Sequence, residues 1–174
     1  MLNLDKIVKK LKNGEKEYFS EFYAMTKSAV FYVVKNTLGS FSVYSEDVMQ
    51  DTYITFLNKL PYIDEGKNYK AYLLSIAKSK SLDELRKHKR IDKSIDPSEM
   101  TIPVLDNEIN GFPLIDYCKK NLKEEEFRLL ELAVIYGFKQ VEIAKMTKTS
   151  VSTVNWRYLK LLVKIRKFYE EVYE

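Results

Sequence analysis

The sequence is poor in the residues on which metal sites, disulfides and tight turns depend. Its 174 residues include one cysteine, Cys118, and one histidine, His88. A single cysteine excludes an internal disulfide framework and a cysteine-based zinc site. His88 lies in a run of lysine and arginine, which is a poor setting for a metal ligand or a catalytic base. Five glycines and four prolines disfavour a β-rich architecture with many tight turns. We therefore expect no catalytic residue, no metal site and no cofactor.

Long apolar runs are also missing. No run approaches the roughly 18 residues that a membrane-spanning helix needs. The first residues, MLNLDK, lack the apolar stretch and small-residue cleavage site of a secretory signal. Together with the single cysteine, this predicts a protein of a reducing compartment, the cytoplasm.

Charge is distributed unevenly along the chain. Residues 67–90 carry 8 basic and 2 acidic side chains, whereas residues 91–113 carry 1 basic and 5 acidic ones. A second basic stretch, residues 145–167, has 7 basic side chains and no acid. Two basic clusters are typical of a protein that contacts a polyanion at two places. Each cluster alone is more typical of a solvated helix face.

Residues 91–113 separate two regions of helical periodicity. They hold three of the four prolines and most of the acidic excess, so we interpret them as a linker. The expected fold is all-α, with a helical bundle over residues 1–90 and a smaller helical domain over residues 114–174. Apolar spacing and breaker residues predict helices over residues 4–12, 15–38, 46–59, 68–90, 114–121, 124–134, 140–146 and 151–169. We expect a loop over residues 39–44, N-caps at Ser45 and Ser150, and a C-cap at Gly137.

The last two predicted helices have the features of a DNA-binding helix-turn-helix. Such a pair needs a small residue midway in its first helix, and Ile143-Ala144 provide it. The second helix must bury one face, for which we expect Val151, Val154, Tyr158, Leu161, Leu162 and Ile165. Its opposite face carries Ser152, Thr153, Trp156, Arg157, Lys160 and Lys164, and the absence of acids there favours DNA over an ordinary amphipathic hairpin.

Two further helix faces suggest partners. On the helix 46–59, Asp47, Gln50, Asp51 and Asn58 lie opposite the apolar stripe, which indicates either a basic protein partner or a solvated face. The helix 68–90 presents Lys78, Arg86, Lys89 and Arg90 near Tyr62, Tyr69 and Tyr72. Basic residues among aromatic ones suit single-stranded nucleic acid, although the spacing of Tyr69 and Tyr72 is also that of core positions.

Four segments in this order resemble an alternative sigma factor of bacterial RNA polymerase, of the extracytoplasmic-function (ECF) class. They are SEDVMQDTY at 45–53, YKAYLLSIAK at 69–78, LDELRK at 82–87 and SVSTVNWR at 150–157. The chain departs from the family pattern at Ser79, where asparagine is usual, and at Trp156, where a small residue is usual. Lys148 occupies a position that helix-turn-helix motifs usually give to glycine in a left-handed turn.

The resemblance implies two helical domains, regions 2 and 4, and a transcription initiation subunit that is not an enzyme. Its partners would be core RNA polymerase and promoter DNA. The resemblance also allows an anti-sigma factor as a third partner. Asp47, Gln50 and Asp51 would contact the polymerase. Tyr62, Asn68, Ser79, Arg86, Lys87 and Arg90 would contact the −10 element, where a flipped base enters a pocket near the 61–69 loop. Ser152, Thr153, Asn155, Trp156, Arg157, Leu159 and Lys160 would contact the −35 element.

Two other functions compete with this one. A stand-alone helix-turn-helix regulator would bind duplex DNA without polymerase, and would make no use of the acidic helix face. A metal-dependent nuclease would need Glu46, Asp47, Asp51 and Asp83 to converge within about 4–6 Å around cations.

Overall fold

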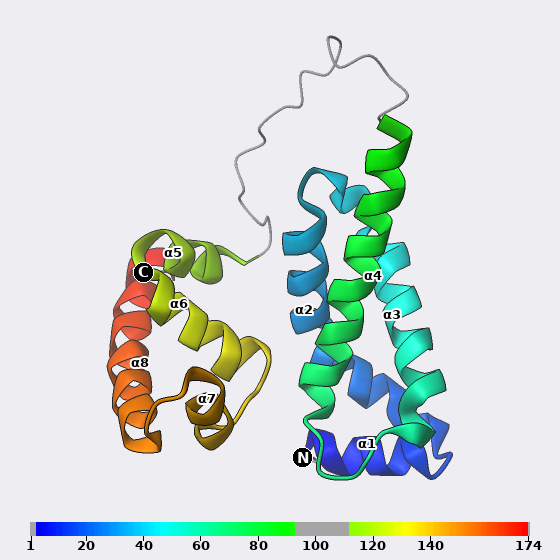
Figure 1. The fold of residues 1–174 in the computed structure, drawn as a ribbon, viewed down its shortest axis with the longest axis horizontal. Coiled ribbons are helices and arrows are strands. Elements are labelled where there is room, and N and C mark those ends of the chain that lie inside the picture. The colour runs from blue at the N-terminus through cyan, green and yellow to red at the C-terminus, as the bar shows by residue number, and fades with distance from the viewer. Residues whose placement is uncertain (1–2, 93–111, 174) are drawn as a thin grey trace. The chain divides into compact units, whose positions relative to one another are not determined.

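The computed structural model describes residues 3–92 and 112–173, and every regular element in them is helical (Figure 1). The expected all-α fold is thus confirmed. The chain divides into two compact units, Met1–Asn107 and Glu108–Glu174. Most of the predicted linker, residues 93–111, lies outside the described residues. None of the described helices combines the length and apolar composition needed to cross a membrane.

The N-terminal unit is a bundle of four helices. They are α1 (Leu4–Lys12), α2 (Phe19–Leu38), α3 (Ser45–Lys59) and α4 (Tyr69–Asp92). Figure 1 shows α2, α3 and α4 running alongside one another, with α1 across the end at which α4 begins. The fully buried side chains come from all four helices: Ile7, Val8, Phe22, Val30, Val34, Phe56, Leu73, Leu74 and Ala77. This shared core fixes which side of α3 and of α4 faces outward.

Asparagine caps and a proline mark where three of these helices begin or end. Asn3 caps α1, because its Oδ1 accepts from the backbone N–H of Lys6 at 3.1 Å. Asn68 caps α4 in the same way, accepting from the N–H of Ala71 at 2.9 Å. As predicted, α3 stops just before Pro61, which sits in a short 3-10 turn, Leu60–Tyr62. The turn fixes the direction in which the chain leaves α3.

The prediction that Ser45 caps α3 is wrong. Residues Gly39–Tyr44, expected as a loop, form 3-10 turns that are kinked at Phe41 (φ −87°, ψ 20°) and lead directly into α3. Tyr44 precedes α3, and Ser45 lies buried in its first turn. Its hydroxyl donates backward to the carbonyl of Ser42 at 2.6 Å instead of accepting from α3.

The C-terminal unit contains α5 (Pro113–Asn121), α6 (Glu124–Leu130), α7 (Gln140–Thr147) and α8 (Val151–Tyr173). A single helix was predicted over 124–134; in the structure α6 passes into a π-helical turn, Glu131–Ile135. The chain then reverses at Gly137, whose φ of +68° is that of a glycine just after the C-terminal end of a helix. The core gathers residues of all four helices: Cys118, Leu122, Leu129, Leu130, Leu132, Ile143, Ala144, Val154 and Leu161.

Lys148 adopts the left-handed conformation that the sequence predicts for the turn between α7 and α8. Its φ of 54° and ψ of 39° are unfavourable for a residue with a Cβ. The turn closes with the N–H of Thr149 bonded to the carbonyl of Ala144 at 3.0 Å. Ser150 then caps α8, since its Oγ accepts from the N–H of Thr153 at 3.1 Å.

Candidate nucleic-acid and protein interfaces

The outer side of α3 is acidic, with one apolar residue among the acids. Asp47, Gln50 and Asp51 are all exposed and lie within one turn of each other. Ile54 lies on the same side and is 51% exposed. The centre of a protein–protein interface is more apolar than its rim, so Ile54 would suit such a centre if this side of α3 binds a partner. Sequence reasoning missed Ile54, because a single apolar residue among polar ones carries no periodic signal.

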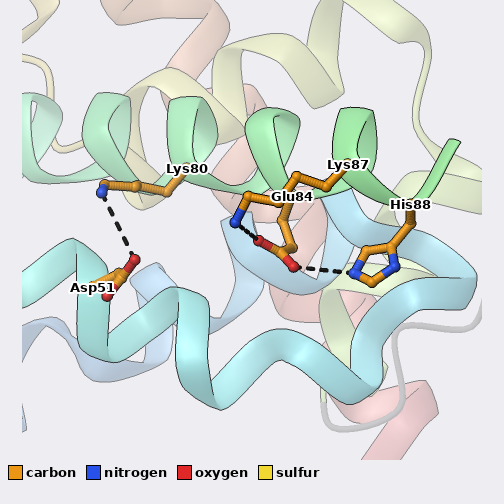
Figure 2. A network of polar contacts seen from close by, with 5 residues as sticks. All are labelled: Asp51, Lys80, Glu84, Lys87 and His88. Atoms are coloured by element: carbon orange, nitrogen blue, oxygen red, sulfur yellow. Dashed lines mark hydrogen bonds and ion pairs between the residues drawn. The ribbon is translucent and has the colours of Figure 1, made fainter. Parts of the chain in front are cut away.

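Asp51 is not free of partners inside the chain. Its Oδ2 lies 3.7 Å from Nζ of Lys80, so this carboxylate bridges α3 to α4 (Figure 2). Both side chains remain partly exposed, at 66% for Asp51 and 36% for Lys80. The acidic side of α3 is therefore held in position by α4 and still reaches solvent.

Further along α4, Glu84 contacts both Lys87 and His88 (Figure 2). It accepts from Nζ of Lys87 at 2.7 Å and hydrogen-bonds Nε2 of His88 at 3.0 Å. The bond from Lys87 is the main cause that lowers the pKa of Glu84, and the same contact raises the pKa of Lys87. The His88 ring also stacks on Tyr44, with centroids 4.1 Å apart. The only histidine thus has a structural role, joining α4 to the turn before α3.

The residues predicted to contact the −10 element do not form one cluster. Ser79 and Arg86 are exposed on α4, and Arg86 is paired with Asp83 at 2.8 Å. Tyr62 is 86% exposed in the turn after α3, whereas Asn68 is the α4 cap described above. The side chains of Lys89 and Arg90 lie outside those that the structure describes.

The tyrosines near the start of α4 separate into two kinds. Tyr69 is 2% exposed and Tyr72 is half-buried against Phe56, so their core spacing, not an aromatic nucleic-acid surface, was the correct interpretation. Tyr62 alone of the three projects into solvent. Beside it in the chain, Pro61 borders a groove of about 390 Å³, at the start of the 61–69 loop near which the resemblance implies a base pocket. Its lining comes from three helices and the turns between them: Leu11, Lys12, Gly14, Lys16, Phe19, Leu57, Leu60 and Pro61.

In the C-terminal unit, α8 presents most of its predicted DNA-facing residues to solvent. Trp156 is 57% and Leu159 64% exposed, and Ser152, Asn155, Arg157 and Lys160 are exposed as well. Thr153 is half-buried and its hydroxyl bonds to that of Ser150 at 2.7 Å. The buried face matches the prediction at Val154 and Leu161.

Two residues predicted to be buried on α8 are exposed. Val151 is 38% and Leu162 40% exposed. Leu162 lies 100° around the helix from Leu161, which is 1% exposed, and therefore falls beyond the edge of the packed side. Val151 is the first residue of α8, where the adjoining turn leaves it partly uncovered.

A cationic groove of about 580 Å³ lies between α6, α7 and α8. Apolar residues line part of it, and its five basic side chains, Lys123, Arg128, Arg157, Lys160 and Lys164, outnumber its two acidic ones, Glu125 and Glu126. Lys164, predicted to lie on the free face, is instead paired with Glu126 of α6. The bond from Lys164 is the main cause that lowers the pKa of Glu126, which also accepts from the N–H of Lys123 at 3.2 Å. The groove places positive charge along one flank of α8.

The acids proposed for a nuclease do not converge. Among residues 3–92 and 112–173, no three histidine, cysteine or acidic side chains are grouped so that they could hold a metal ion. Asp51 and Asp83 are instead engaged by Lys80 and Arg86.

Comparison with known proteins gives consistent results. Residues 22–91, from α2 to the end of α4, match the sigma-70 region 2 family. The ECF RNA polymerase sigma factor SigK of Mycobacterium tuberculosis H37Rv is 24% identical over 173 residues, spanning 94% of this chain and 92% of its own length. SigK of Mycobacterium bovis BCG Pasteur is similar to the same extent.

Two solved structures are also similar. One is the sigma factor RpoE of Bartonella quintana, in complex with the anti-sigma factor NepR (18% identity, 89% of this chain and 98% of that one, TM-score 0.48). The other is CnrH in complex with the cytosolic domain of CnrY (18% identity, 96% and 97%, TM-score 0.47). Residues 22–91 are thus similar to sigma-70 region 2, and nearly the whole chain aligns with ECF RNA polymerase sigma factors.

Proposed function

We propose that this chain is the promoter-recognition subunit of a bacterial RNA polymerase holoenzyme. It binds core polymerase through α3, opens the −10 element beside α4, and binds the −35 element through α8. The observation that carries the proposal is the exposed acidic side of α3 inside the part of the chain that matches sigma-70 region 2. Such a subunit works where the chromosome is, so we assign it to the cytoplasm.

The contact with polymerase uses charge and apolar surface together. Asp47, Gln50 and Asp51 suit a basic partner surface, which steers association and fixes orientation. Ile54 supplies the apolar contact that charge alone does not. A stand-alone DNA-binding regulator would have no use for this acidic side, because DNA would repel it.

Promoter opening uses the aromatic and basic residues that follow α3. Tyr62 is free to stack on an unpaired base, and Arg86 and Lys87 lie on exposed parts of α4, where they can follow a single strand. The groove beside Pro61 is large enough for one extruded base. Base capture and backbone contacts must together offset the cost of unstacking, which is a few kcal/mol.

Duplex recognition belongs to α7 and α8. Ser152, Thr153, Asn155, Trp156, Arg157, Leu159 and Lys160 occupy the first three turns of α8, the part of a recognition helix that contacts base edges. The seven basic and no acidic residues of 145–167 provide the attraction to phosphate. The family is not an enzyme class, and in this function the chain supplies binding energy rather than catalytic groups.

Reconstitution with cognate core polymerase tests the proposal. The wild-type chain should pull down core enzyme and direct a run-off transcript from a promoter with no other sigma factor present. Asp47→Lys combined with Asp51→Lys should lose both activities. The matched control, Glu17→Lys with Asp64→Lys, changes two exposed acids outside α3 by the same total charge and should retain core binding.

Two outcomes would contradict the proposal. Undiminished pull-down by the α3 variant would remove the assignment of this surface. DNA binding by the wild-type chain without any transcript in the presence of core enzyme would indicate a stand-alone regulator instead.

A further inference from the structure

The exposed side of α8 is apolar along its centre. Trp156, Leu159 and Val163 are 57%, 64% and 61% exposed, and they follow one another along one side of the helix, within about 60° of its circumference. None of them belongs to the buried cluster of the C-terminal unit. Lys123, Arg128, Arg157, Lys160 and Lys164 outnumber Glu125 and Glu126 in the groove that Trp156 lines, so an anionic occupant that also offers apolar groups suits this surface.

The hydroxyl groups at the start of α8 are already engaged with each other. The Ser150 hydroxyl lies 2.8 Å from that of Ser152 and 2.7 Å from that of Thr153. A hydroxyl has one hydrogen to donate, so these contacts reduce what Ser152 and Thr153 can offer to a base edge. The apolar side chains and the neighbouring cations therefore carry more of the recognition than the hydroxyls do.

Trp156 and Lys160 form a pair on this surface. They are one turn apart, and Nζ of Lys160 lies over the indole ring, 4.0 Å from its centroid. The cation–π contact restrains the ring and holds the ammonium beside it. The pair thus presents an apolar ring together with a hydrogen-bond donor that lies 4.0 Å from the ring centroid.

Only one base matches that combination in the major groove. Thymine has a C5-methyl group next to the O4 acceptor, whereas cytosine has an amino donor there and the purines have no methyl group. We propose that Trp156 and Lys160 together select a thymine: the indole packs on the methyl group and the ammonium donates to O4. This inference rests on the proposed function, in which α8 enters the major groove of the −35 element.

The test begins with holoenzyme made from the full chain and cognate core polymerase. Promoter duplexes randomised in the −35 region are selected with the wild-type chain and with Trp156→Ser. We expect the wild-type chain to enrich thymine at a position where the variant does not. Two modified duplexes then separate the two contacts: deoxyuridine at that position removes only the methyl group, and 5-methylcytosine paired with guanine keeps it while exchanging O4 for an amino group.

The expected losses are specific to each variant. Deoxyuridine should weaken DNA binding by wild-type holoenzyme about fourfold, which is the effect of removing one methylene-sized apolar group. DNA binding by the Trp156→Ser holoenzyme should not change. 5-Methylcytosine should weaken DNA binding by wild-type holoenzyme. Holoenzyme with Lys160→Met should instead bind the thymine and 5-methylcytosine duplexes with the same affinity. Tyr169→Ser, a half-exposed aromatic far along the same helix, is the matched control and should discriminate as the wild-type chain does.

The outcomes separate this inference from the proposed function. Trp156 is exposed, so its variant should keep wild-type helicity in circular dichroism. Suppose that a −35 element is selected, and that deoxyuridine lowers the affinity of wild-type and Trp156→Ser holoenzymes equally or not at all. This result would overturn the thymine assignment and leave the −35 function standing. No enrichment at any −35 position would overturn both.

Discussion

Lys80 of α4 lies 3.7 Å from Asp51 of α3, so a residue proposed to bind polymerase is also part of an intramolecular ion pair (Figure 2). A partly exposed pair of this kind contributes only about 0–1 kcal/mol to stability. In the proposed function a basic group of the partner competes with Lys80 for the same carboxylate, so we expect the pair to affect binding more than stability.

Replacement of Lys80 tests that competition. Lys80→Met should change the free energy of unfolding by less than about 1 kcal/mol and should tighten binding to core polymerase modestly, since it frees Asp51. Urea unfolding and titration with labelled core enzyme measure the two effects. Lys78→Met, which removes an exposed lysine of the same helix, should leave core binding unchanged. Weaker binding by Lys80→Met would mean that Lys80 orients Asp51 instead of competing for it.

Asn68 was expected to contact the −10 element, and the structure shows it capping α4. Asn68→Ala should therefore destabilise the N-terminal unit by about 1 kcal/mol, whereas Asn68→Asp should restore most of the loss because aspartate also caps. Urea unfolding followed by circular dichroism gives the comparison. A promoter-opening defect that persists in the stable aspartate variant would show that the amide has a second role in DNA contact.

Lys148 carries a conformational cost in the turn before α8. Lys148→Gly should stabilise the C-terminal unit by about 0.5–1 kcal/mol, because glycine has no Cβ to strain at φ 54°. Trp156, the only tryptophan, lies in this unit, so its fluorescence can follow unfolding. Lys145→Gly is the opposite control, since it places glycine inside α7 and should destabilise by about 1 kcal/mol. Destabilisation by Lys148→Gly would show that the lysine side chain makes a compensating contact.

Glu126 should make the C-terminal unit sensitive to acid. Its pKa is lowered from the ordinary value of 4.5, chiefly by the bond from Lys164, so its contribution to stability is present above pH 4.5. That contribution is lost as the pH falls through the lowered pKa, when the folded protein binds the proton. The difference in Tm between wild type and Glu126→Gln should therefore be constant near neutral pH and shrink below pH 4.5.

Glu125→Gln provides the control for this pH series, because Glu125 is an exposed neighbour on the same first turn of α6. The difference in Tm between Glu125→Gln and wild type should be smaller than the difference for Glu126→Gln. A Glu126→Gln difference that grew toward low pH would contradict the assigned direction of the pKa shift.

Much of the secondary structure follows from local chemistry. Apolar spacing placed the helices, Asn13-Gly14 and Gly137 marked two helix ends, and Ser150 marked the start of α8, because these signals depend on a few neighbouring residues. The left-handed Lys148 was also expected, because the helix-turn-helix pattern usually has a left-handed glycine at this position. Ser45 was not, because whether a serine caps a helix depends on the conformation of the chain before it.

The sequence by itself determined that the protein is helical, which helices are amphipathic, and where acidic and basic residues concentrate, because periodicity and composition are properties of the chain alone. Only the tertiary structure decided how those residues are used. Packing of α4 on α3 brings Lys80 to Asp51, packing of α6 on α8 pairs Lys164 with Glu126, and the buried core leaves Ile54 exposed. These outcomes depend on contacts between residues distant in sequence, and no local pattern contains them.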